Sequence, residues 1–433
     1  MQFYSTNNVS HKSDLKNAVI NGLAPDKGLY MPEEIPVLPE SFWIDLPNMN
    51  LGEIGYHVLK PYFCPTIPEG EFKELTKEAF NFPIPLQKVS ENISSLELFH
   101  GPTLAFKDIG ARFLARVMAQ FTRGMEHHIN VLVATSGDTG SAVANGFLGV
   151  DGVDVYVLYP KGLVSEVQEK QFTTLGQNIT AIEIDGTFDD CQRLVKSAFM
   201  DEDLQNKLVL TSANSINLAR FLPQMVYYFY GYAQAVKQGK KDIIVSVPSG
   251  NFGNLTAGII AYKMGLPVKH FIAATNINDI VPKYLYSGIY SPAKSISTPA
   301  NAMDVGDPSN FVRIQDLFDK KLEGIKNVIT GYVCPNEDIF AMIEKVFTDN
   351  DYILDPHGAI GYKSLTELLD EGEFGMFLAT AHPAKFPETV EEIIKQKVEQ
   401  PDRLKAFLAG KKDVEELSED FESFKSFLLN VCK

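Results

Sequence analysis

Cysteine, long apolar runs and positive charge are all scarce in this sequence. Its 433 residues include four cysteines, none in a C-x-x-C pair, so neither a disulfide framework nor a structural zinc site is supported, and no metal is expected. No stretch approaches the roughly 18 apolar residues that span a membrane, and the polar N-terminal segment has no apolar stretch of signal-peptide length. These absences predict a cytoplasmic protein with reduced thiols and no membrane contact.

The charged residues are mostly acidic. Lys and Arg number 39 against 55 Asp and Glu, which gives a formal net charge of −16. Non-specific binding to nucleic acid, which needs an excess of basic residues, is therefore not expected. A small anionic ligand is compatible with this charge, because a single pocket can be positive on an acidic protein.

From about residue 91, short runs rich in Val and Ile alternate with helical patterns. This alternation predicts an α/β fold with mostly parallel sheets and helices on both faces. A long helical pattern over residues 217–239 is expected to link two α/β units. The predicted strands are residues 131–135, 153–160, 179–185, 243–248, 270–276 and 374–380.

The motif HGPTLAFKDIG, which begins at His100, contains a candidate catalytic lysine. Lys107 follows an apolar Leu-Ala-Phe triplet and opens a helical pattern. Apolar surroundings lower the pKa of a lysine and make its amine nucleophilic, as a Schiff base requires. Taken alone, such a lysine is more often a solvated residue at a helix start.

Two Gly-rich turns each follow a predicted strand and precede a helix. PSGNFGN, from Pro248, can bring backbone N–H groups close to a phosphate, although it is equally a plain strand-to-helix turn. It lacks the spacings of the nucleotide-triphosphate and dinucleotide loops, which argues against a kinase or a dehydrogenase. ATSGDTGSA, from Ala134, can bind a carboxylate or phosphate in the same way and also has the pattern of an N-capping turn.

The motif TAHPAKF begins at Thr380, at the end of a predicted strand. Open α/β sheets bind ligands at the carboxyl ends of their strands, so the Thr380 hydroxyl is a candidate ligand-binding group. His382 and Lys385 in the same motif are as readily explained by structural roles.

These four motifs occur together with NSINLAR (214–220) and AMDVGDPSNF (302–311). In this order they resemble the fold-type-II enzymes that use pyridoxal 5'-phosphate (PLP), which have a tryptophan synthase β-like fold. Among these enzymes, they are most similar to the threonine synthases of the bacterial and yeast kind. The resemblance extends from Phe3 to about Glu388.

The resemblance implies a role for each motif. Lys107 is expected to hold PLP as a Schiff base and to act as the catalytic acid and base. The other residues expected to bind the cofactor are Ser249, Gly250, Asn251, Phe252, Gly253, Asn254 and Thr380. The residues expected to bind the substrate are Thr135, Ser136, Gly137, Asp138 and Thr139 for its α-carboxylate, and Lys161, Ser165, Asn217 and Arg220 for its phosphate.

The activity implied is the conversion of O-phospho-L-homoserine and water to L-threonine and phosphate, by γ-elimination and β-addition. The enzyme would be a monomer or a homodimer with a small-molecule substrate. Three parts are expected: an N-terminal segment over residues 1–90, a large PLP-binding domain over residues 91–125 and 226–433, and a small substrate-closing domain over residues 126–225.

Two alternatives remain at this point. A threonine or serine dehydratase, or a β-replacing synthase, would share Lys107 and the phosphate loop, and only the phosphate leaving group separates these enzymes from a threonine synthase. A non-catalytic relative that binds PLP or phosphate is opposed by the presence of both Lys107 and Thr380.

Three positions qualify the resemblance. Asn7 stands where the family usually has arginine, and Lys27 stands where it usually has glycine. Asp138 is usual in this subgroup, but asparagine is common at this position across the wider fold type. The role of Asp138 toward the cofactor hydroxyl is therefore left open.

Overall fold

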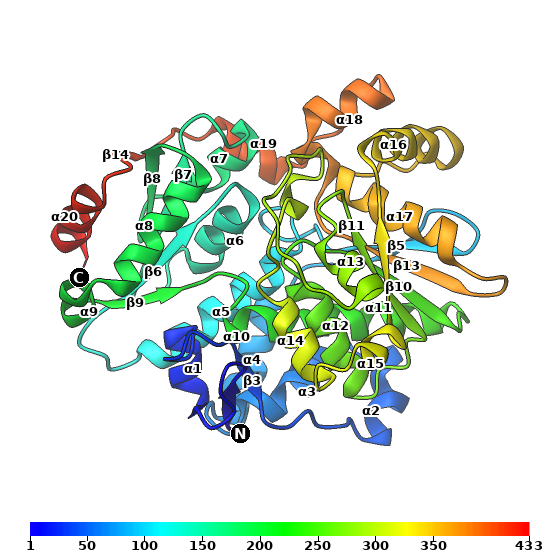
Figure 1. Cartoon of the computed structure of the whole chain (residues 1–433), viewed down its shortest axis with the longest axis horizontal. Helices are drawn as coiled ribbons and strands as arrows, with labels where there is room; N and C mark the ends of the chain where they lie inside the picture. Colours follow the sequence, from blue (N-terminus) through cyan, green and yellow to red (C-terminus); the bar gives the residue numbers. More distant parts are fainter. Residues whose placement is uncertain (433) are drawn as a thin grey trace.

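The computed structural model describes residues 1–432 and contains two α/β units above an N-terminal segment (Figure 1). The larger unit is built on a six-stranded sheet in the order β12-β11-β10-β13-β5-β4, which is parallel except for the pairing of β4 with β5. The smaller unit is built on a five-stranded parallel sheet in the order β14-β8-β7-β6-β9. The predicted α/β fold with mostly parallel sheets is confirmed.

The six predicted strands correspond to β6, β7, β8, β10, β11 and β13, whereas β4, β5, β9, β12 and β14 were not predicted. Both sheets are covered on two faces, which is why central strands such as β6, β10 and β13 are apolar at most positions rather than at alternate ones. The larger sheet comprises β4 (Leu86–Lys88), β5 (Ile93–Glu97), β10 (Ile243–Pro248), β11 (His270–Thr275), β12 (Ile329–Val333) and β13 (Phe374–Ala379). The smaller sheet comprises β6 (Ile129–Ala134), β7 (Val153–Pro160), β8 (Ile179–Asp185), β9 (Val209–Ser212) and β14 (Glu415–Ser418).

Alternate residues of each strand belong to separate hydrophobic clusters. In the larger sheet, Val245 packs with the cluster that includes α11 and α12, whereas Ile244 packs with the cluster that includes α16 and α17. The helices of this unit are α11 (Met225–Lys237), α12 (Gly253–Lys263), α13 (Ile280–Ser287), α14 (Phe311–Leu317), α15 (Leu322–Lys326), α16 (Asn336–Asn350), α17 (Pro356–Leu368) and α18 (Pro387–Ile394), with 3-10 turns η3 (Asn301–Met303) and η4 (Pro383–Lys385).

The smaller sheet is covered in the same way. Leu132 packs with a cluster that includes α8 and α20, and Val133 packs with the cluster that includes α5 and α6. The helices on and around this unit are α5 (Lys107–Thr122), α6 (Asp138–Phe147), α7 (Glu166–Thr173), α8 (Phe188–Met200), α9 (Glu202–Lys207), α19 (Asp402–Ala409) and α20 (Phe421–Val431).

The predicted large domain extends too far toward the C-terminus. Residues 415–418 form β14, which pairs in parallel with β8 and lies at the edge of the smaller sheet. Figure 1 shows β14 and α20, in red, on the same side as β8 rather than beside α16 and α17. An edge strand carries unpaired N–H and C=O groups that accept a further strand, and the short, charged β14 has no apolar run that would predict it. The rest of the three-part division remains a prediction.

The helical pattern over residues 217–239 is broken near its start. Pro223 divides it into α10 (Leu218–Phe221), a 3-10 turn η2 (Leu222–Gln224) and α11. Proline has no N–H to donate to the preceding turn, which favours a break in the helix at this point.

The N-terminal segment is an antiparallel sheet with four helices. Lys27, at the position where the resembling family usually has glycine, adopts a left-handed backbone with φ of 66°. The elements are β1 (Phe3–Ser5), β2 (Lys12–Ser13), β3 (Tyr30–Pro32), α1 (Leu15–Asn21), α2 (Glu40–Asp45), η1 (Leu46–Asn48), α3 (Leu51–Phe63) and α4 (Glu69–Ala79).

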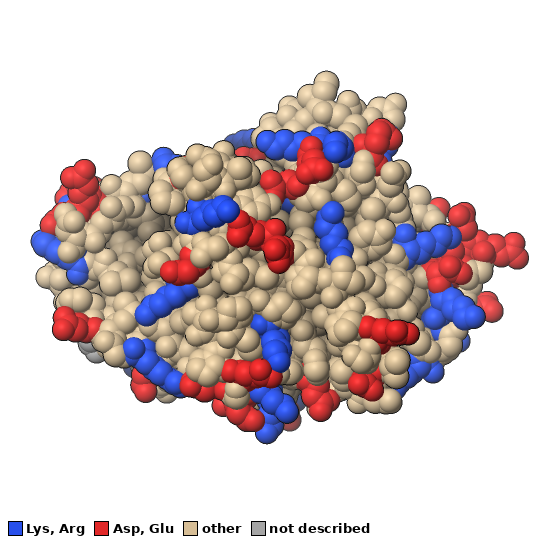
Figure 2. Space-filling model, turned by 90° about the horizontal axis from the view of Figure 1, so that it is seen from below, with Lys and Arg blue, Asp and Glu red and all other residues tan. Residues whose placement is uncertain are grey.

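On the face seen in Figure 2, blue Lys and Arg side chains are interspersed with red Asp and Glu side chains. Across residues 1–432, none of the helices combines the length and the apolar character that crossing a bilayer requires.

Candidate active site

Three of the predicted motifs meet at the carboxyl edge of the larger sheet. The phosphate loop follows β10, Thr380 follows β13, and the segment that leads to Lys107 follows β5, all neighbouring strands in the sheet order. A short antiparallel connection fixes two of them together, because Phe106 N donates to Thr380 O at 2.9 Å and His382 N donates to Leu104 O at 3.1 Å. Thr380 and Lys107 are therefore brought together by backbone pairing of residues that lie far apart in the sequence.

Lys107 is the first residue of α5, and its side chain is 17% exposed. Burial lowers the pKa of its amine, and the positive charges of Lys385 and Arg220 lower it further, whereas Asp138 opposes this shift. The Lys107 Nζ atom lies 3.7 Å from Asp138 Oδ2. An amine with a lowered pKa is unprotonated more often at neutral pH, which is the form that attacks a carbonyl or accepts a proton.

Asp108 holds the turn that precedes Lys107. Its carboxylate accepts hydrogen bonds from Thr103 N at 2.8 Å and from Thr103 Oγ1 at 2.7 Å. Burial raises the pKa of Asp108 to about 6, although the two bonds from Thr103 and the charge of Lys385 oppose this rise. Asp108 also lies in the first turn of α5, where the helix dipole favours a negative charge.

The phosphate loop is held in shape by its own side chains. Ser249 Oγ donates to Asn254 Oδ1 at 3.0 Å, and Asn254 Nδ2 donates to Pro248 O at 2.8 Å. Phe252 has a left-handed backbone with φ of 61° and precedes Gly253, the first residue of α12. The first N–H groups of a helix have no partner within the helix, so this arrangement presents backbone donors to an anion.

Glycine is required at position 250 because the backbone of the phosphate loop closely approaches the backbone of residues 302–303. A Cβ atom at this position would lie 2.7 Å from Ala302 O and 2.9 Å from Met303 Cα. On the other side of the loop, Asn251 O accepts from Asn310 N at 3.1 Å. The AMDVGDPSNF motif therefore supports the phosphate loop, a role that its position in the sequence did not reveal.

The turn at residues 135–139 differs in part from the prediction. The Thr135 hydroxyl accepts from Gly137 N at 3.0 Å and from Gly140 N at 2.8 Å and donates to Gly137 O at 3.1 Å, so its hydrogen bonds all stabilise the turn. Ser136 is exposed and Thr139 is half-buried. These two side chains and the first N–H groups of α6 are the groups that this turn can offer to a ligand.

Two of the four residues predicted to bind the substrate phosphate have other partners. Lys161 Nζ lies 2.9 Å from Glu416 Oε2 and 3.5 Å from Glu183 Oε2, so its charge is already balanced by carboxylates. The Asn217 amide donates to Val19 O at 2.8 Å and accepts from Ala219 N at 3.0 Å, which ties α1 to the start of α10. Both polar groups serve the fold in this structure, and their assignment to the substrate phosphate stays a prediction.

Arg220 remains a candidate for binding an anion. The side chain is 4% exposed, Nη1 donates to Ala213 O at 2.7 Å, and the buried Nε atom has no hydrogen-bond partner among the described residues. Burial lowers its pKa to about 10. Ser165 caps α7 by accepting from Gln168 N at 3.4 Å, and it also donates to Gln168 Oε1 at 3.0 Å.

The sequence-based predictions missed three groups of this site. Lys385 Nζ lies 2.6 Å from Asp138 Oδ1, and Gln168 Nε2 donates to the same oxygen at 2.9 Å. Gln171 Nε2 donates to Thr103 O at 3.0 Å and so connects α7 to the Lys107 motif. Lys385 could have been noticed, because it lies in the TAHPAKF motif. The sequence did not indicate that its partner is Asp138.

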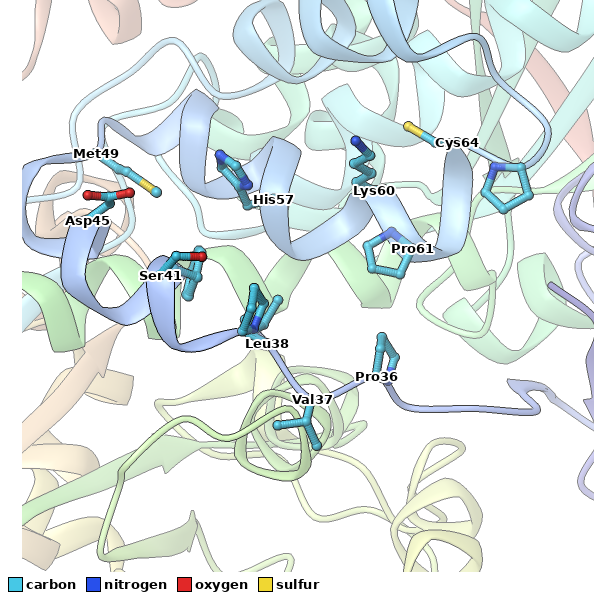
Figure 3. Close-up of a pocket in the computed structure, with 13 residues that line it drawn as sticks. Pro36, Val37, Leu38, Ser41, Asp45, Met49, His57, Lys60, Pro61 and Cys64 are labelled. Atoms are coloured by element: carbon cyan, nitrogen blue, oxygen red, sulfur yellow. The ribbon is translucent and has the colours of Figure 1, made fainter.

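A separate hollow of about 580 Å³ lies in the N-terminal segment, between the 36–41 stretch and α3 (Figure 3). None of the predicted site residues lines it, so it is distinct from the candidate active site. Its lining is formed by Pro36, Val37, Leu38, Pro39, Ser41, Phe42, Asp45, Met49, His57, Lys60, Pro61, Cys64 and Pro65.

Three family descriptions cover almost all of the chain. Residues 2–80 match "Threonine synthase N terminus", residues 80–376 match "Pyridoxal-phosphate dependent enzyme", and residues 358–428 match "Threonine synthase, C-terminal". The chain is 44% identical over 429 residues to the threonine synthase of Haemophilus influenzae, a match that covers 99% of this chain and all of that protein.

Solved structures agree with the sequence relatives. The threonine synthase of Escherichia coli superposes with a TM-score of 0.92 at 40% identity and covers 99% of this chain and 100% of that one. The PLP-bound threonine synthase of Brucella melitensis gives a TM-score of 0.93 at 35% identity, with 99% of each chain covered. Pyridoxal phosphate is the cofactor, and the chain belongs to the threonine synthase family.

Proposed function

We propose that the chain converts O-phospho-L-homoserine and water to L-threonine and phosphate, with Lys107 as the residue that carries PLP and transfers protons. The observation that carries this proposal is the position of the Lys107 amine. It is largely enclosed, with the side chain 17% exposed, it has a lowered pKa, and it lies at the sheet edge where the phosphate loop and Thr380 also lie. The chain's membership of the threonine synthase family supports the same activity.

The donor groups at this edge fit PLP. The Ser249–Asn254 loop is expected to hold the phosphate through the N–H groups at the start of α12, and the Thr380 hydroxyl is expected to face the ring nitrogen. A hydroxyl at that place leaves the ring nitrogen largely unprotonated. When bound, PLP withdraws electrons from the α-carbon of the substrate and so makes its proton easier to remove.

Lys107 supplies the proton transfers. Once the substrate amine has displaced it, the free amine is positioned to accept the Cα proton and to return a proton later in the reaction. Its lowered pKa keeps a larger share of the amine uncharged at neutral pH. Asp108 and Thr103 hold the turn before it, so the amine begins each cycle in the same place.

We assign the substrate α-carboxylate to the 136–139 turn. Ser136, Thr139 and the first N–H groups of α6 offer hydrogen-bond donors there, and Gly137 has a φ of 144°, which only glycine adopts readily. Thr135 supports this turn from behind.

We assign the substrate phosphate to Arg220. It is the remaining cation among the predicted phosphate ligands, and its Nε atom is buried without a hydrogen-bond partner in the described chain. A charge-assisted hydrogen bond contributes about 1.5–3 kcal/mol, so Arg220→Ala is expected to raise the KM for phosphohomoserine roughly 10- to 150-fold. Lys161→Ala is the matched control and should leave KM unchanged.

The test of the reaction itself is to incubate the purified protein with PLP and O-phospho-L-homoserine and to measure phosphate and threonine together. Equal amounts of both products, lost in Lys107→Ala, are expected. Phosphate without threonine would instead indicate elimination to a keto acid, as in a related lyase. Retained PLP binding with neither product would overturn the substrate.

We also infer that the enzyme works in the cytoplasm as a monomer or homodimer. All four cysteines are free thiols, which fits a reducing compartment. Sedimentation equilibrium of the holoenzyme distinguishes the two assemblies.

A further inference from the structure

Asp138 is a buried carboxylate between two lysines. Lys385 Nζ lies 2.6 Å from Asp138 Oδ1, and Lys107 Nζ lies 3.7 Å from Asp138 Oδ2. The Lys385 side chain is fully buried, and its amine also donates to Thr103 O at 2.9 Å. Gln168 completes the surroundings of the carboxylate with a bond of 2.9 Å.

The two lysines differ in how closely they engage this carboxylate. The Lys385 contact has the length of a charge-assisted hydrogen bond, whereas the Lys107 contact does not. Burial alone would raise the pKa of Asp138, but Lys385 and then Lys107 outweigh this effect and lower it, so the carboxylate is ionised. Asp138 and Lys385 thus form an ion pair with no net charge next to Lys107.

The charges that face Lys107 come from three other elements. Asp138 on α6 favours the charged amine, whereas Lys385 on η4 and Arg220 on α10 disfavour it. Lys385 therefore acts on Lys107 twice, through its own positive charge and by neutralising Asp138. Without it, Asp138 would have Lys107 as its nearest cation, and the Lys107 amine would be held in its protonated, unreactive form.

We propose that Lys385 is a positioning residue for Lys107: it neutralises Asp138 and so leaves the Lys107 amine uncharged and available for the cofactor and for the substrate proton. This inference rests on the proposed role of Lys107. The Asp138–Lys385 ion pair carries no net charge, as a neutral side chain would. This explains how an aspartate can occupy position 138 next to a reactive lysine.

The alternative is that Lys385 only holds Thr103 and the surrounding backbone. Two variants distinguish the explanations, because they should shift the titration of Lys107 in opposite directions. Lys385→Met removes the positive charge and leaves Asp138 with Lys107, which should raise the pH at which Lys107 titrates. Asp138→Asn removes the negative charge and should lower it. The double variant, D138N with K385M, removes both charges as well as the bond to Thr103.

The experiment measures titration of Lys107 in the full-length protein freed of PLP. Labelling of Lys107 by acetic anhydride is followed by peptide mass spectrometry as a function of pH, and the rate of PLP capture is followed by absorbance. An opposite charge at this distance shifts a pKa by about 1–3 units, so K385M should raise the midpoint by about one unit or more and slow PLP capture at neutral pH about tenfold. The double variant should recover most of the rate.

Lys363→Met is the matched control, because Lys363 is also a poorly exposed lysine paired with two carboxylates but lies on α17. It should change neither quantity. An unchanged Lys107 midpoint in K385M, or a double variant as slow as K385M, would overturn the proposal. If K385M does not fold, D138N provides the test. A Lys107 midpoint in D138N that is not lower than in the unchanged protein would also overturn the proposal. None of these readouts requires phosphohomoserine turnover, so a wrong substrate would leave the result for Lys385 intact.

Discussion

Replacing Gly250 by alanine should weaken PLP binding, because the added atom has no room. Its Cβ would lie 2.7 Å from Ala302 O and 2.9 Å from Met303 Cα, and ordinary contact begins at 3.4 Å, so the loop and its neighbour must separate by 3.4 − 2.7, or about 0.7 Å. Both neighbours are backbone atoms and cannot rotate away. The clash is therefore relieved only by moving a segment.

The size of the effect follows from the cost of overpacking. Adding a methyl group to a closely packed site costs about 1–3 kcal/mol. If the phosphate loop moves, that cost appears in cofactor binding, where each 1.4 kcal/mol is tenfold, so the Kd for PLP should rise roughly 5- to 150-fold. If residues 302–303 move instead, the free energy of unfolding falls and the Kd is unchanged.

The assay is titration of the PLP-free protein with PLP, together with urea unfolding of the same sample. Gly70→Ala is the control, because Gly70 lies in α4 and nothing surrounds the position of its added Cβ within 4 Å. This control should bind PLP normally and gain a few tenths of a kcal/mol or more in stability. A Gly250→Ala protein with normal Kd and normal stability would refute the close packing on which the reasoning depends.

Three further predictions concern stability. Burial raises the pKa of Asp108 to about 6, so the folded state holds this proton to higher pH than the unfolded state; stability should fall by about 1 kcal/mol between pH 5 and pH 7, and Asp108→Asn should lose this slope in urea titrations at the two pH values. Arg313 is fully buried and donates to Tyr30 O and Ile216 O, so Arg313→Met should leave unpaired carbonyls and lower the unfolding free energy by about 3 kcal/mol, whereas an unchanged urea midpoint would contradict this role. Lys27→Gly should raise stability by about 0.5–1 kcal/mol, because glycine adopts the left-handed backbone at this position without strain; differential scanning calorimetry should show a higher Tm.

The central strands of both sheets were largely predictable. The runs at 153–160 and 179–185 coincide with β7 and β8, because most residues of these strands are apolar and buried. The charged strand β14 could not be found in this way, since its stability comes from pairing with the edge of β8. The break at Pro223 had a visible signal, but the apolar pattern on either side of it obscured the boundary.

The site was predictable at the level of motifs and less so at the level of single side chains. Strand ends correctly placed the phosphate loop after β10 and Thr380 after β13, but β5, which leads to Lys107, was not predicted. The roles of Asn217 and Lys161 depended on Val19 and Glu416, which lie 198 and 255 residues away in the sequence. A polar side chain in a motif can serve either a ligand or the fold, and only the partner decides which.

An acidic chain can bind the phosphate of PLP without an excess of positive charge around the site. Near Lys107, the cations Lys385 and Arg220 face the carboxylates of Asp108 and Asp138, so an uncharged Lys107 leaves no net charge from these groups. Attraction of the cofactor phosphate must then come from directed donors rather than from an excess of positive charge. The start of α12 provides such donors, and its N–H groups keep their orientation whatever the charge of the rest of the protein. The net charge of −16 is thus compatible with binding of the cofactor phosphate, because the donors at the start of α12 belong to the backbone.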